Sequence, residues 1–252
     1  MNISLDKLVN SSTMDEANQS AEFRKLLHDS SKSSLYFLCK VILGFDKMVD
    51  HLHKPVCNFI QSTSIKRKML ILPRGHFKSS ICAIGYPIWL LIQNPNSRIL
   101  ISNATATNAE HFLRVIKNIF EKNATFQCLF PELIPDFSHP DKWSENEIQV
   151  PRTASWPESS IETIGVGGRV TSRHYDYIIK DDLVGNPMDD MLVPSIDEHQ
   201  KAIQWHEYTE ALAVELDELN DVIVGTRWHT TDLYAHIINT DHWDAVIDFD
   251  PD

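Results

Sequence analysis

The chain has 252 residues, 42% of them hydrophobic, which is enough for one α/β core with a small appended subdomain. No apolar run approaches the roughly 18 residues that a membrane span needs, and the first residues lack the features of a signal peptide. The cysteines show no C-x-x-C spacing, which indicates reduced thiols in a cytosolic protein.

The net charge of −12 is distributed unevenly along the chain. Residues 1–110 hold 13 Lys/Arg and 8 Asp/Glu, whereas residues 111–252 hold 10 and 27. Broad, tight binding to a DNA duplex requires a basic face, which the carboxyl half lacks. The charge therefore disfavours a tight DNA-binding monomer, but it permits weak phosphate contacts made by a few loops.

Strands and helices are predicted to alternate after residues 1–50, which read as a polar leader and helical lead-in. The predicted strands are residues 69–72, 98–102, 147–150, 160–165, 175–180, 221–224 and 243–249. The predicted helices are residues 79–93, 107–122, 195–216 and 231–238. Pro87 should kink or break the first of these helices. The alternation predicts an α/β main domain at residues 51–252, with a mostly parallel sheet covered on both faces.

The stretch 69–80 has the layout of a phosphate-binding loop: an apolar strand, a tight turn, Lys-Ser and then a helix. The first turn of such a helix offers free N–H groups to an anion. The residues expected around the anion are Pro73, Arg74, Gly75, His76, Phe77, Lys78, Ser79 and Ser80. The usual pattern has glycines where this chain has Leu72 and Phe77, so a core strand with a basic turn is the alternative interpretation.

A second motif is the apolar strand of residues 175–180, which ends in the adjacent acids Asp181 and Asp182. A phosphate-loop ATPase places such a strand beside its first strand, so we expect the acids near Lys78. Asp181 would then hold a magnesium ion, and Asp182 would orient or deprotonate the attacking water. Paired acids are also common in ordinary turns.

The third motif follows the predicted strand 221–224. Gly225, Thr226 and Arg227 bring a small residue, a hydroxyl and a cation to a strand end. Open α/β sheets bind their ligands at the carboxyl ends of strands.

Together, the segments PRGHFKS, IIKDDL and GTRWH resemble the ATPase domain of tailed-phage terminase large subunits, the motors that package DNA into proheads. Residues 94–101 resemble that family's second strand, and residues 165–174 resemble its glycine-rich segment, so the likeness covers roughly residues 50–240. The resemblance implies a phosphate-loop NTPase fold of the ASCE type. In that family an arginine four residues before the lysine is frequent, and Arg74 and Lys78 have this spacing.

The resemblance implies a role for each matching residue. Lys78 would contact the β- and γ-phosphates, Ser79 the magnesium ion, and Arg74 the γ-phosphate or the transition-state charge. Asp181 would serve the metal, and Asp182 the attacking water. Departures from the family pattern are a phenylalanine before Lys78 in place of a small residue, and a second acid shorter than the usual Glu.

Beyond the hydrolytic site, Gly225, Thr226 and Arg227 stand where the family has its coupling motif. Arg169 and Arg173 are the candidates for an arginine finger that acts on a neighbouring subunit.

Further expectations follow from the same resemblance. The substrate would be ATP with Mg²⁺, and the partners would be double-stranded DNA, a portal protein and a small terminase subunit. We expect a homo-oligomeric ring in the host-cell cytoplasm, encoded by a virus or prophage, without membrane contact. No segment resembles the family's nuclease domain, so we expect no nuclease activity. The alternatives are another nucleic-acid-linked phosphate-loop ATPase, such as a helicase-like protein, and a degenerate nucleotide-binding assembly module.

Overall fold

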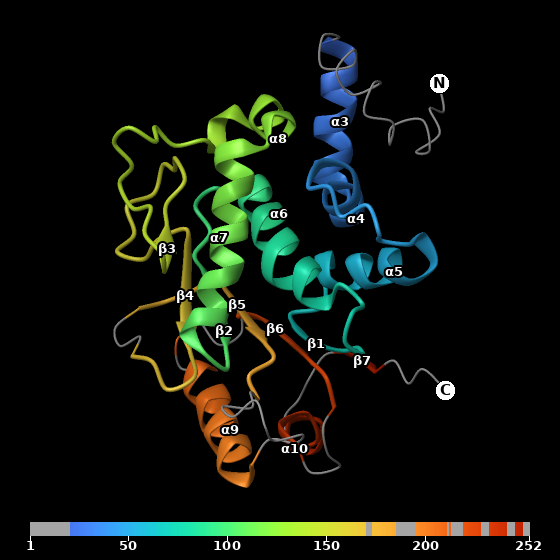
Figure 1. Ribbon diagram of the computed structural model, residues 1–252, viewed down its shortest axis with the longest axis vertical. Coiled ribbons are helices and arrows are strands. Elements are labelled where there is room, and N and C mark those ends of the chain that lie inside the picture. The colour runs from blue at the N-terminus through green and yellow to red at the C-terminus, as the bar shows by residue number, and fades with distance from the viewer. Residues whose placement is uncertain are drawn as a thin grey trace.

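The computed structural model describes residues 21–169, 173–184, 195–210, 212, 219–227, 232–240 and 245–248. Its strands are β1 (Arg67–Ile71), β2 (Ile99–Asn103), β3 (Glu147–Ile148), β4 (Ile161–Gly165), β5 (Tyr177–Asp181), β6 (Asn220–Gly225) and β7 (Ala245–Asp248). They form one sheet in the order β3-β4-β2-β5-β6-β1-β7 (Figure 1). All neighbouring pairs are parallel except β3 with β4, so the predicted mostly parallel α/β sheet is confirmed.

The α-helices of the described residues are α3 (Ala21–Ser33), α4 (Leu35–Phe37), α5 (Asp50–Gln61), α6 (Tyr86–Gln93), α7 (Ala106–Lys122), α8 (Ala124–Leu129), α9 (Ile196–Glu210) and α10 (Leu233–Thr240). Two π-helical segments, η1 (Leu38–Ile42) and η2 (Ser80–Gly85), and a 3₁₀ turn, η3 (Pro131–Leu133), complete the set. Part of the predicted helix 195–216 lies outside the described residues. Among the described residues, no helix combines the length and apolar character needed to cross a bilayer.

Helices cover both faces of the sheet (Figure 1). Helices α3 to α8 lie on one face with the larger hydrophobic cluster, and α9 and α10 lie on the other with a smaller cluster. Side chains of a strand point alternately to its two faces. In β1, Leu70 accordingly belongs to the larger cluster, whereas Met69 and Ile71 belong to the smaller one.

Two polar contacts at the end of α5 connect this helix to the sheet and to α4. The buried ammonium group of Lys68 on β1 donates a hydrogen bond to the Ile60 carbonyl (2.7 Å). The Gln61 side chain accepts a hydrogen bond from the Leu35 backbone (2.7 Å), which fixes α4 against α5. These contacts hold the helices that pack next to the loop after β1.

The helix after the loop begins where the sequence predicted, but Pro87 does not break it. Instead, η2 precedes α6, and the Tyr86 amide bonds to the Ile81 carbonyl five residues back. Proline cannot donate to the carbonyl four residues earlier, and its ring clashes with that group in an ordinary α-helix. The wider π-helical turn accommodates Pro87 in the first turn of α6. The helix therefore runs on to Gln93.

Candidate functional site

The loop that joins β1 to the following helix turns by means of two residues with left-handed backbone conformations. Gly75 has φ of +85° and Phe77 has φ of +56°. The His76 ring lies 3.2 Å from the Pro73 carbonyl, which closes the turn. The Phe77 carbonyl accepts the Ile81 amide at 2.8 Å, so the helical hydrogen bonds begin within the loop itself. The loop therefore presents a helix amino terminus at the carboxyl edge of the sheet.

Phe77 holds its unfavourable backbone conformation through packing of its ring. A non-glycine residue in the left-handed region costs about 1–2 kcal/mol. The Phe77 ring lies edge-on to the His53 ring (centroids 5.5 Å apart) and near Phe45 (6.4 Å). Both partners precede β1: Phe45 follows η1, and His53 lies in α5. The missing glycine is therefore replaced by an aromatic anchor, which the sequence did not reveal because its partners lie more than twenty residues away.

Lys78 and Asp182 meet across the carboxyl edge of the sheet. The Lys78 Nζ lies 3.4 Å from Asp182 Oδ2, and the lysine side chain is only 7% exposed. Asp182 has φ of +40°, so the chain turns sharply as it leaves β5. Its amide donates to the Val224 carbonyl (2.9 Å), and its carbonyl accepts the Ala104 amide (3.3 Å). The main chain thus fixes the position from which the Asp182 carboxylate reaches the loop.

Asp181 is the buried member of the acid pair, at 1% exposure. Burial, and then the charge of Asp182, raise the pKa of Asp181 to about 7, while a hydrogen bond from Ser79 and the charge of Lys78 lower it. The Asn103 side chain at the end of β2 also donates to Asp181 Oδ2 (3.3 Å) and to its carbonyl (2.8 Å). Sequence reasoning missed Asn103, although a polar residue ending a buried strand is a usable signal.

The surroundings of Asp181 suit a divalent cation. Its Oδ1 atom is buried and has no hydrogen-bond partner among the described residues. A buried carboxylate with a raised pKa gains from an adjacent positive charge, and Ser79 offers a hydroxyl beside it. No cluster of three or more His, Cys, Asp or Glu occurs within the described ranges. Magnesium keeps several waters and binds substrate phosphates, so it needs few ligands from a protein.

The segment after β6 touches the loop after β1. Thr226 Oγ1 donates to the Leu72 carbonyl (3.3 Å), and the Leu72 amide donates to the Gly225 carbonyl (3.2 Å). Arg227 Nε pairs with Asp232 Oδ2 (3.2 Å) ahead of α10. The expectation that the acidic strand lies beside the first strand is wrong, because β6 lies between β1 and β5. Lys78 and Asp182 still meet because both leave their strands at the same edge.

The remaining candidate arginines lie around this edge. Arg74 has an exposed side chain in the loop after β1. Arg169 is exposed after β4, and Arg173 forms an ion pair with Glu162 of its own chain. Arg169 and Arg173 line a cavity of about 450 Å³ at the carboxyl end of β4. The structure therefore brings Lys78, Ser79, Asp181 and Asp182 together. Arg169 follows β4, and Arg173 pairs with Glu162 of β4, which lies two strands from β5.

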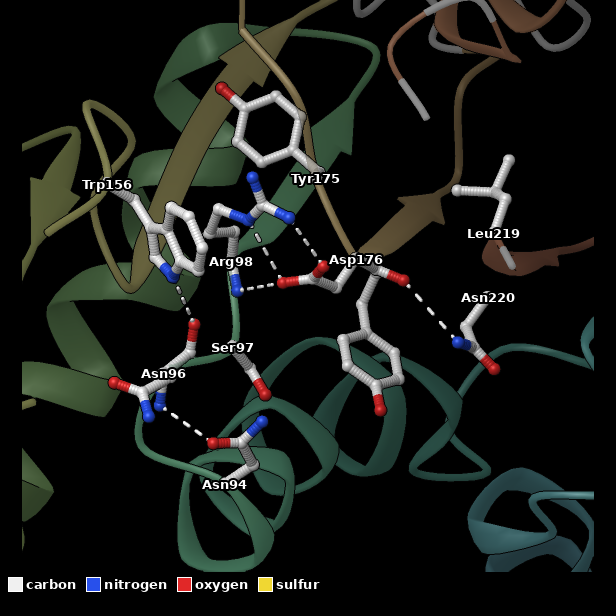
Figure 2. A pocket seen from close by; sticks show the side chains of 10 residues that line it. Asn94, Asn96, Ser97, Arg98, Trp156, Tyr175, Asp176, Leu219 and Asn220 are labelled. Carbon is white, nitrogen blue, oxygen red and sulfur yellow. Dashed lines mark hydrogen bonds and ion pairs between the residues drawn. The ribbon is translucent and has the colours of Figure 1, made fainter. Parts of the chain in front are cut away.

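A separate pocket of about 280 Å³ lies at the opposite edge, near the amino ends of β2, β5 and β6 (Figure 2). Arg98 pairs with Asp176 through two contacts, Nε–Oδ2 at 3.1 Å and Nη2–Oδ1 at 2.7 Å. The guanidinium lies 4.8 Å from the centroid of the Trp156 ring. The two charges neutralise each other, and open α/β sheets bind ligands at the other edge. We therefore assign this pocket a structural role.

Next to the acid pair along β5, a charged cluster joins β5 and β6 to α9. Lys180 Nζ lies 2.6 Å from Asp221 Oδ2 and 2.9 Å from His206 Nδ1. Lys180 and Asp221 are completely buried. Lys180 directly precedes Asp181, so this cluster also supports the strand that carries the acids.

The comparisons with known proteins leave the family open. No protein-family model matches this chain, and no curated protein shows a significant sequence match.

The raised pKa of Asp181 predicts a pH dependence of stability in the nucleotide-free chain. Its folded pKa of about 7 exceeds the ordinary 3.8, so the folded state binds more protons between these values. The contribution of Asp181 to the free energy of unfolding is therefore largest below about pH 4 and is lost as pH rises through about 7. This contribution amounts to at most about 4 kcal/mol. Urea unfolding between pH 4.5 and 7.5 should show this decline in the parent and a smaller one in Asp181→Asn. An exposed-site control, Asp46→Asn, should match the parent; an unchanged decline in Asp181→Asn would contradict the prediction.

Proposed function

We propose that this chain is a magnesium-dependent phosphate-loop ATPase that powers the movement of double-stranded DNA into a viral capsid. The observation that carries the proposal is the contact between the loop lysine and the acid pair. Lys78 Nζ lies 3.4 Å from Asp182 Oδ2, and Ser79 is bonded to the buried Asp181. A lysine and a hydroxyl at a helix amino terminus, facing two carboxylates, suit the binding and hydrolysis of a nucleoside triphosphate.

The contact between Lys78 and Asp182 supports a specific sequence of events. Without substrate, the two charges neutralise each other at the sheet edge. A triphosphate carries more negative charge than one carboxylate, so it draws the Lys78 ammonium group onto its β- and γ-phosphates. Asp182 is then released to orient a water for in-line attack on the γ-phosphorus and to accept its proton. The loop amide groups and Arg74 stabilise the charge that develops on the phosphoryl oxygens.

The metal site would be shared between protein and substrate. Asp181 and Ser79 would hold the ion, and the unpartnered Asp181 Oδ1 is the atom with a remaining acceptor position. When bound, Mg²⁺ neutralises charge on the β- and γ-phosphate oxygens.

The motor part of the proposal rests on the resemblance to terminase large subunits. The contacts of Thr226 with Leu72 and of Arg227 with Asp232 support it, because they connect the loop to α10. The proposed partners are DNA, a portal protein and a small terminase subunit, with the chain assembled as a homo-oligomeric ring. We favour Arg169 as the finger toward a neighbouring subunit, since Arg173 is already paired with Glu162.

Asp182→Asn tests the proposed chemistry. The substitution keeps the side-chain size and removes the proton acceptor, so kcat for ATP should fall by about 10²–10⁴ while nucleotide affinity is largely retained. The measurement is phosphate release with Mg²⁺, at protein concentrations that allow oligomers to form. Asp46→Asn, at an exposed site, is the matched control. Equal turnover in parent and Asp182→Asn would refute the assignment, and nucleotide binding without turnover in the parent would favour an assembly module.

A further inference from the structure

Tyr234, in the first turn of α10, has a hydroxyl group with no function in the hydrolysis described above. The side chain is completely buried, and its Oη has no hydrogen-bond partner among the described residues. Buried hydroxyl groups are nearly always hydrogen-bonded, so an unpartnered one calls for an explanation. The position of the residue is firmly set, because Asp232 Oδ1 accepts the Ala235 amide (3.0 Å) and Asp232 Oδ2 pairs with Arg227.

The phenol ring of Tyr234 lies directly against Gly225 at the end of β6. A β-carbon at Gly225 would lie 1.9 Å from both Cζ and Oη of the tyrosine, so only glycine leaves room for the ring. The same contact brings the hydroxyl to the tip of the strand that separates the loop from the acids. Gly225 is thus required by Tyr234 and not by the geometry of a turn.

The hydroxyl is also a neighbour of the acid pair. In the parallel register of β5 and β6, Asp181 lies opposite Val224, so Asp182 continues next to Gly225. Neighbouring strands are about 4.8 Å apart, so the end of β5 that carries Asp182 is adjacent to the end of β6 on which the Tyr234 ring packs. Burial, followed by the charges of Asp182 and Asp181, raises the pKa of Tyr234 well above its ordinary value. The group therefore remains a hydrogen-bond donor at physiological pH.

We propose that Tyr234 is a positioning residue for hydrolysis: its hydroxyl donates to the Asp182 carboxylate once Lys78 has moved from that carboxylate to the triphosphate. This inference rests on the proposed ATPase function. In the free chain the Asp182 carboxylate faces Lys78, which explains why the tyrosine hydroxyl has no acceptor among the residues that the structure describes. In the loaded state the hydrogen bond replaces the lost ion pair and holds the carboxylate toward the attacking water.

Tyr234→Phe separates this role from a purely structural one. Removing an unpartnered buried hydroxyl should leave the melting temperature of the free chain equal or higher. In contrast, kcat for ATP should fall about tenfold or more, with KM unchanged, because a hydrogen bond to a charged group is lost only in the loaded state. If the tyrosine hydroxyl had only a structural role, Tyr234→Phe would not lower kcat while leaving the melting temperature unchanged or higher.

Tyr36→Phe is the matched control, since Tyr36 is also buried but its hydroxyl donates to Asp50 (2.6 Å) and not to a group of the proposed site. It should lower the melting temperature and leave kcat unchanged. Retained kcat in Tyr234→Phe, under conditions where Asp182→Asn is inactive, would overturn this inference alone. Absence of turnover in the parent would overturn the proposed function and this inference with it.

Discussion

Lys78→Ala should reduce ATP turnover by about a hundredfold or more and weaken the binding of ATP. The side chain is the buried cation at the helix amino terminus, and charge stabilisation by one such group is worth about 10²–10³ in kcat. Its loss would remove the group that we propose to neutralise the β- and γ-phosphates, and it leaves Asp182 without its ion-pair partner. Steady-state phosphate release and titration with a fluorescent ATP analogue measure the two effects separately.

Lys47→Ala is the control for this substitution, because it removes a lysine from an exposed position in the lead-in. Its turnover and affinity should equal those of the parent. If Lys78→Ala hydrolysed ATP at the rate of Lys47→Ala, the loop would not be a phosphate site. A loss of activity accompanied by unfolding would be recognised from the circular dichroism spectrum of the variant.

Lys180→Met should lower the free energy of unfolding by about 3–5 kcal/mol, because it leaves the Asp221 carboxylate buried without its cation. Lys180 and Asp221 are both 0% exposed and lie 2.6 Å apart. Methionine preserves most of the side-chain volume, so the loss reports on the charge and not on a cavity. Urea unfolding at pH 7 measures it.

Two further variants show whether the stability loss in Lys180→Met arises from the unpaired buried charge. Lys142→Met removes a partly exposed lysine that pairs with Glu147 at 3.2 Å, and it should cost less than about 1 kcal/mol. The double variant Lys180→Met/Asp221→Leu should recover much of the loss, because no charge then remains buried without a partner. A loss below about 1 kcal/mol in Lys180→Met would show that water or another group compensates Asp221.

Local patterns predicted the strands of this fold and helices α6, α7, α9 and α10, but not the short helix α8. The apolar runs that predicted strands at residues 98–102 and 221–224 are β2, shifted by one residue toward the carboxyl end, and β6, longer by one residue at each end. Period-3.6 spacing predicted the helix at 107–122, which the structure begins one residue earlier, after Thr105 caps it. Such signals are contained in short windows of sequence, so they can be read without knowledge of the tertiary contacts.

Features that depend on distant contacts were not predictable from the chain. The order of strands inserts β6 between β1 and β5, and no local pattern encodes this neighbour relation. Asn103 reaches Asp181 only because β2 pairs with β5. The fit of Tyr234 against Gly225 likewise arises from the docking of α10. The sequence indicated which side chains gather at the carboxyl edge of the sheet. It did not indicate that β6 lies between the strands that carry them.

The position of β6 has a mechanical consequence for the proposed motor. The strand is hydrogen-bonded along its length to β1 on one side and to β5 on the other. The gap between loop and acids is therefore set by two ladders of main-chain bonds, which deform little under tension. If the proposed motor pulls against a resisting polymer, the two ladders are expected to keep the reacting groups aligned.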